Sequence, residues 1–106
     1  MSDDELEKRF HRAMIQIYER SRREIKYTPT YFLQMVNESG GLGAAKQLLQ
    51  KDVVSEGFVK LWENKRLDLS VEAHVIRGEF RPLFTDEEIA IAERRLRDVD
   101  YQFGEL

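Results

Sequence analysis

The sequence predicts an all-α fold, a compact and irregular bundle of about six helices with a long N-terminal helix. Leu, Ile, Ala, Glu and Arg are abundant and only 2 prolines occur in 106 residues, a composition that favours helix. Apolar residues recur at three- and four-residue steps in most of the chain, which is the period of one helix face. The length is that of one domain, so we expect residues 1–106 to form a single helical domain, with a long helix at 3–26 and a helical core at 27–100.

The first helix is predicted over residues 3–26. Its acidic start and basic end suit the helix dipole. At about 1.5 Å per residue it would span about 35 Å. That exceeds the expected width of the domain, so the helix should bend, fray or extend to a partner. Its apolar face comprises Leu6, Phe10, Ala13, Met14, Ile17, Tyr18, Ser21 and Ile25.

Two shorter helices should follow, over residues 29–39 and 42–50. Thr28 can cap the first of them, and Gly40-Gly41 can end it by adopting left-handed dihedral angles. Gly43, which precedes two alanines, indicates close packing against another backbone. A phosphate-binding loop is not indicated there, because no strand precedes it and no Gly-Lys-Ser/Thr follows.

A fourth helix is predicted over residues 56–66, with Ser55 as its N-cap. Phe58, Leu61 and Trp62 lie on one stripe of this helix. We expect all three in the core, because large aromatic side chains dominate burial in small domains.

Residues 67–75 alternate between apolar and polar side chains, which alone indicates a half-buried strand. No other segment alternates, so a strand here would have no partner within the chain. Ser70 is a good N-cap, and Glu72 suits the first turn of a helix. We therefore predict a short helix over about residues 70–79, and a strand that pairs across a dimer is the alternative.

The clearest local signal is the capping box of Thr85 and Glu88. It predicts a last helix over residues 86–99. Its inward side chains would be Ile89, Ala92, Leu96 and Val99, and we expect Tyr101 and Phe103 to fold back onto the bundle.

The composition disfavours membrane and secreted proteins. No apolar run approaches the ~20 residues that span a bilayer, and the acidic N-terminus lacks the features of a secretory signal. With no cysteine, the chain has no disulfide, thiolate nucleophile or cysteine-bound metal. We expect a reduced, cytoplasmic protein with no cofactor and no metal.

Charge is unevenly distributed along the chain. Residues 8–26 carry seven Lys or Arg against two Glu, whereas residues 83–106 carry three Arg against seven acids, and the net charge is −3. A basic helix face can bind nucleic acid or another anion, or it can face acidic segments of its own fold. The candidate anion-binding residues are Arg9, Arg12, Arg20, Arg22, Arg23 and Lys26.

Catalytic signals are sparse. Neither histidine has a second histidine at ligand spacing, and His11 lies among basic residues, where a surface position is expected. Glu72 and His74 are two apart on a predicted helix and point to different sides, so an acidic site with Asp68 would need side chains from other helices. A helix-turn-helix interpretation of residues 55–76 fails, because its second helix begins without the Arg, Lys, Asn or Gln that read bases.

A set of short motifs runs through residues 27–100. They are Tyr31-Phe32-Leu33-x-Met35, Gly40-Gly41 with Ala44-Ala45-Lys46, Gly57-Phe58 followed by Leu61-Trp62-Glu63, the run from Arg66 to Ala73, and Leu83-Phe84-Thr85-x-Glu87-Glu88. Together they resemble a small bacterial all-helical domain family of uncharacterised function. The resemblance implies a helical fold and supplies no catalytic residues. The basic helix at 8–26 lies outside it.

We therefore expect a non-enzymatic protein-interaction or binding module that self-associates, whose partner is another protein or a second copy of the chain and not a membrane. One alternative is a nucleic-acid-associated accessory protein that places the basic face of its first helix on phosphates. Another is a small enzyme with an acidic site near Asp68, Glu72 and His74.

Overall fold

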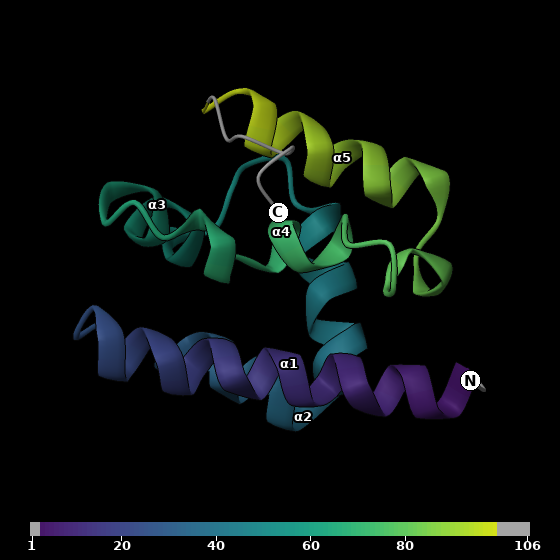
Figure 1. Ribbon diagram of the computed structural model, residues 1–106, viewed down its shortest axis with the longest axis horizontal. Helices are drawn as coiled ribbons and strands as arrows, with labels where there is room; N and C mark the ends of the chain where they lie inside the picture. Colours follow the sequence, from purple (N-terminus) through teal and green to yellow (C-terminus); the bar gives the residue numbers. More distant parts are fainter. Residues whose placement is uncertain (1–2, 100–106) are drawn as a thin grey trace.

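The computed structural model describes residues 3–99 (Figure 1). Within this part of the chain the fold is all-α and contains no strand, which confirms the predicted fold class. The molecule measures 35 × 27 × 26 Å. Its elements are α1 (Asp3–Glu24), α2 (Thr30–Gln50), α3 (Glu56–Glu63), η1 (Leu67–Leu69), α4 (Val71–Val75), η2 (Arg81–Leu83) and α5 (Asp86–Arg97), where η marks a short 3-10 helix.

The long first helix runs the length of its own molecule. Its 22 residues span about 33 Å, close to the longest dimension of 35 Å, and it packs lengthwise against the first half of α2 (Figure 1). It ends where Lys26 adopts a left-handed φ of 60° and the N–H of Tyr27 donates to the carbonyl of Ser21 at 3.1 Å. The length of α1 therefore needs no partner to explain it.

The two helices predicted over residues 29–39 and 42–50 are joined as α2, which breaks at Gly40, where the sequence predicts the end of the first. Gly40 has φ 77° and ψ 163°, so two helical segments meet there and the second turns away from α1 (Figure 1). The close approach expected at Gly43 occurs instead at Gly41, where an added methyl carbon would lie 2.6 Å from Cα of His11. The predicted cap is also wrong, because α2 begins at Thr30 without a side-chain hydrogen bond from Thr28.

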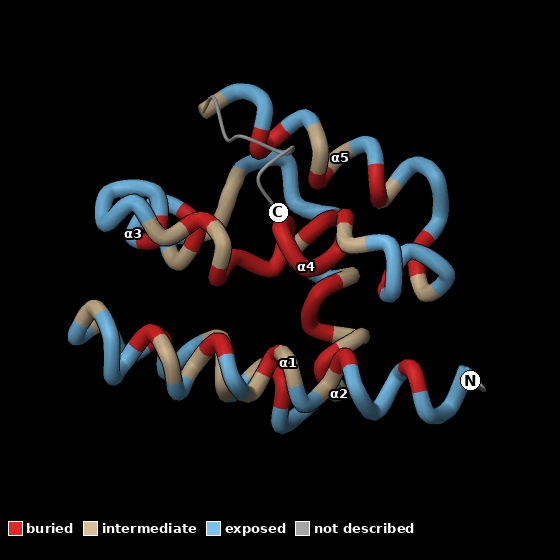
Figure 2. Tube along the Cα trace, in the orientation of Figure 1, coloured by how far each residue is buried: buried red, intermediate tan, exposed pale blue. Residues whose placement is uncertain are grey.

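The short helix α4 lies at the centre of the fold. All five of its residues are buried (Figure 2), and Ser70 caps it by accepting the N–H of Ala73 at 3.1 Å. The helix predicted over 70–79 is thus shorter than expected, and η1 precedes it. Residues 67–75 do not form the alternative strand. Their alternation does not mark a half-buried surface, because the polar residues Ser70, Glu72 and His74 are buried along with the apolar ones.

The third helix is shorter than predicted, and it buries fewer of its large side chains than predicted. It ends at Glu63 rather than at residue 66, and Ser55 caps it by accepting the N–H of Phe58 at 3.1 Å. Phe58 and Leu61 are buried as expected, but Trp62 is 50% exposed, so its predicted place in the core is wrong. The buried face of α3 is limited to Phe58 and Leu61, and Trp62 lies one turn from Val59, which is also exposed.

The last helix closes the fold on the side opposite α1 (Figure 1). The capping box of Thr85 and Glu88 is present, and α5 packs against α4 and the second half of α2. Ile89, Ala92 and Leu96 are buried and Val99 is partly buried, whereas Tyr101 and Phe103 lie outside the described residues. No helix between residues 3 and 99 is long and apolar enough to cross a membrane.

Candidate anion-binding hollow

The six predicted anion-binding residues divide into two groups on α1. Arg9, Arg12 and Arg20 lie on one face and line a hollow of about 280 Å³. Arg22, Arg23 and Lys26 are exposed at the C-terminal end of the helix and do not line it. The structure therefore brings together half of the predicted set.

The opposite wall of the hollow comes from α4 and the turn that follows it. Arg77, His74, Glu79 and Phe80 belong to this wall. We call the group Arg9, Arg12, Arg20 and Arg77 the arginine hollow. Arg77 is absent from the predicted set, because nothing in the sequence indicates that the turn after α4 lies beside the middle of α1.

Two of the four arginines are already paired. Nη2 of Arg9 lies 2.8 Å from Oε2 of Glu79, with both side chains about half exposed. Nε of Arg20 lies 2.7 Å from Oε2 of Glu24, which also pairs with Arg66, and these hydrogen bonds lower the pKa of Glu24 to about 2. Within residues 3–99, Arg12 and Arg77 form no ion pair. The hollow thus holds two guanidinium groups whose charge is not neutralised locally.

The floor of the hollow includes a buried histidine. His74 is 6% exposed, and its Nδ1 lies 2.7 Å from the carbonyl of Ser70, so the proton sits on Nδ1 and donates to that oxygen. Burial lowers the pKa of His74 to about 4, although its hydrogen bond to Ser70 acts in the opposite direction. The imidazole is therefore uncharged at pH 7, and the positive charge of the hollow comes from arginine alone.

This arrangement suits an oxyanion. A guanidinium is planar, keeps its charge at any physiological pH, and presents several N–H donors that match a carboxylate or a phosphate. Arg12 and Arg77 approach the hollow from two elements, so one anion between them would receive donors from both sides. The hollow can therefore accept a single compact anionic group.

The predicted acidic site is not assembled. Asp68 pairs with Arg66, with 3.1 Å between Oδ1 and Nε. Glu72 points away from the arginine hollow and pairs with Arg95, with 3.1 Å between Oε2 and Nη1. The structure thus places His74, Glu72 and Asp68 in three different environments. Within residues 3–99, no group of three or more His, Asp or Glu lies close enough to hold a metal ion.

Two polar contacts inside the fold were missed by sequence reasoning. Arg95 is 7% exposed, and besides Glu72 it donates to the carbonyls of Leu48 at 3.1 Å and Lys51 at 2.6 Å, which end α2. His11, expected at the surface, is half-buried, and its Nδ1 accepts the N–H of Gly41 at 2.9 Å. That N–H begins the second segment of α2 and has no intrahelical partner. Only the tertiary packing reveals either role.

Comparisons with known proteins give no further guide to this site. The chain matches no family model, no curated protein and no solved structure.

Proposed function

We propose that this protein is a non-enzymatic binding module, and that the arginine hollow holds an anionic side chain of a protein partner. One observation carries the proposal: arginines from α1 and from the turn that follows α4 line one hollow, and two of them have no ion-pair partner among residues 3–99. A cluster of like charges is unfavourable for the folded chain alone, and an incoming anion relieves it. The ligand class is a carboxylate or a phosphorylated side chain.

The compactness of the hollow favours a protein partner over nucleic acid. A duplex offers a row of phosphates, and proteins that bind one typically neutralise about six to ten of them. Here three basic residues gather at the hollow on α1, while Arg22, Arg23 and Lys26 lie apart at the helix end. Glu79 and Glu24 further reduce the local positive charge. One anionic group fits this pattern better than a polyanion.

The proposal is tested by calorimetric titration at low salt with a short peptide that carries one phosphoserine, compared with the same peptide carrying serine. We expect the phosphorylated peptide to bind, and Arg12→Gln or Arg77→Gln to weaken binding by about tenfold or more, because each removes a charge-assisted hydrogen bond. Arg22→Gln is the matched control, since Arg22 is exposed on the same helix outside the hollow, and it should leave the affinity unchanged.

Two results would contradict the proposal. One is that neither peptide binds at low salt. The other is salt-sensitive binding of random duplex DNA that Arg22→Gln weakens as much as Arg12→Gln does, which would support the nucleic-acid alternative instead.

Self-association is supported by a separate observation. Val59 and Trp62, one turn apart on α3, are 37% and 50% exposed, and tryptophan is enriched at protein interfaces. We expect sedimentation equilibrium to show a dimer that Trp62→Lys converts to a monomer, because the lysine would bring a charge into the interface. A wild-type protein that is monomeric at all concentrations would remove this proposal.

A further inference from the structure

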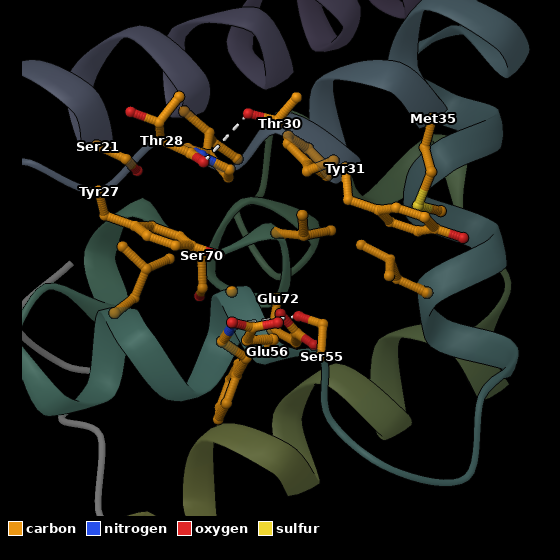
Figure 3. Close-up of a pocket in the computed structure, with 18 residues that line it drawn as sticks. Ser21, Tyr27, Thr28, Thr30, Tyr31, Met35, Ser55, Glu56, Ser70 and Glu72 are labelled. Carbon is orange, nitrogen blue, oxygen red and sulfur yellow. Dashed lines mark hydrogen bonds between the residues drawn. The ribbon is translucent and has the colours of Figure 1, made fainter.

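A second hollow, of about 330 Å³, lies on another face of α4. It is lined by the last turns of α1, the segment that joins α1 to α2, the first turns of α2, and the helices α3 and α4, and it is partly open to solvent (Figure 3). We call it the apolar hollow. Most of its wall is hydrocarbon or aromatic ring, and the principal contributors are Phe32, Met35, Leu48, Phe58 and Leu61.

The size of the apolar hollow suits a compact molecule. An engineered cavity of about 150 Å³ with similar lining stays dry and binds benzene, so a hollow of about 330 Å³ corresponds to a body roughly twice that size. Ligand sites in general begin near ~300 Å³. A two-ring or short branched molecule would fill the space, whereas a long acyl chain would not fit.

Ser21, in the last turns of α1, is the polar residue of the hollow whose hydroxyl is both buried and without a partner among the described residues. Its side chain is 1% exposed, and its hydroxyl is the single buried side-chain polar atom between residues 3 and 99 that has no hydrogen-bond partner. Ser21 lines the hollow together with Tyr27 and Thr28 (Figure 3). A buried hydroxyl without a partner is unfavourable, so this atom can offer a hydrogen bond to a molecule that enters.

The other buried polar groups of the hollow are already engaged. Ser70 donates its hydroxyl proton to the carbonyl of Leu67 at 2.7 Å and accepts the N–H of Ala73 at 3.1 Å. Glu72 is 3% exposed and is neutralised by Arg95 across 3.1 Å. The buried part of the hollow therefore presents no unpaired charge. A charged ligand would lose its hydration there without gaining an ion pair.

From these observations we propose that the apolar hollow binds an uncharged, compact amphiphile, an apolar body that carries one hydroxyl or carbonyl group, with that group hydrogen-bonded to Ser21. This site is independent of the arginine hollow, for which the proposed ligand is a charged group. The hydroxyl of Ser21 sets the polarity of the ligand, and the walls set its size.

The test uses 2-naphthol, naphthalene and 2-naphthoate as probes, with affinities measured by ligand-detected NMR. We expect 2-naphthol to bind and 2-naphthoate to bind more weakly. Ser21→Ala should weaken 2-naphthol binding by about three- to tenfold, the worth of one neutral hydrogen bond, and should leave naphthalene binding unchanged. Ser21→Ala removes only the unpartnered oxygen, so folding should be unaffected.

Two further variants complete the test. Met35→Trp should abolish binding of all three probes by filling the space, and Arg12→Gln should change none of them, because Arg12 belongs to the other hollow. The inference is overturned if 2-naphthol does not bind, or if its affinity is the same in wild type and Ser21→Ala. Either failure is distinct from a failure of the anion-binding proposal, which is read from the phosphopeptide titration and needs neither Ser21 nor Met35.

Discussion

Two ionisable side chains of α4 are removed from water within a helix of five residues. Glu72 has Arg95 as its partner, and His74 has the carbonyl of Ser70. Burial raises the pKa of Glu72 and lowers that of His74, because in each case it penalises the charged form. The charged form of Glu72 therefore depends on the neighbouring guanidinium of Arg95, whereas His74 is an uncharged hydrogen-bond donor at pH 7.

The low pKa of His74 predicts a loss of stability in acid. Its pKa falls from 6.5 to about 4 on folding, so below pH 6.5 the unfolded chain binds a proton that the folded chain does not. This contribution to stability is complete above pH 6.5 and is lost as the pH falls towards 4. The stability of the folded state should drop by about 2 kcal/mol between pH 7 and pH 5 from this group alone.

The matched variant is His74→Asn, whose amide can still donate to the carbonyl of Ser70. In urea unfolding experiments, the free energy of unfolding should fall between pH 7 and pH 5 by about 2 kcal/mol less in the variant than in wild type. The charged groups that influence His74, Arg77, Asp68 and Arg20, are present in both proteins. Equal pH dependence in the two proteins would show that His74 does not titrate as its burial requires.

The packing of α1 on α2 depends on Gly41. An added methyl carbon there would lie 2.6 Å from Cα of His11, and backbone cannot move aside as a flexible side chain can. We expect Gly41→Ala to lower the free energy of unfolding by about 1–3 kcal/mol through overpacking, measured by urea denaturation.

Gly57→Ala provides the control. Gly57 is also helical, has no positive φ, and its added methyl carbon would meet nothing closer than 3.7 Å. The free energy of unfolding of Gly57→Ala should equal that of wild type or exceed it by up to about 1 kcal/mol, since alanine restricts the unfolded chain. If Gly41→Ala were as stable as Gly57→Ala, the close approach of the two helices would be disproved.

The elements themselves could largely be predicted, because their signals are local. The caps at Ser55, Ser70 and Thr85 each involve residues within one helical turn, and all three form as expected. The break at Gly40 is likewise a property of one residue. The predicted ends were less accurate, since the ends of α3 and α4 depend on how the chain turns next.

The candidate site could be predicted only in part, because it depends on distant contacts. The period of α1 places Arg9, Arg12 and Arg20 on one face. Arg77 reaches them only because η1 and η2, which precede and follow it in the chain, pack on that helix. The role of His11 and the exposure of Trp62 likewise depend on contacts between residues that are far apart in the sequence. The helical period places Ser21 on the apolar face of α1. That pattern gives no sign that the hydroxyl of Ser21 lacks a hydrogen-bond partner.

At the scale of the whole molecule, basic and acidic segments lie apart. Arg9 and Arg20 of α1 pair with Glu79 and Glu24. The described acidic residues of the C-terminal segment lie on or beside α5, across the molecule (Figure 1). Among the described residues, the basic face of α1 therefore does not pair with the acidic α5. This separation leaves the arginine hollow open to an anion from outside.

The arginine hollow is tested most directly by NMR of the arginine side chains of the full chain, with nitrogen-15 labelling and the phosphoserine peptide added at low salt. We predict that the Nε–H signals of Arg12 and Arg77 shift together with a single affinity, while those of Arg22 and Arg23 stay in place. Shifts confined to Arg22 and Arg23, or no shift in any arginine signal, would contradict the proposal that this hollow is the binding site.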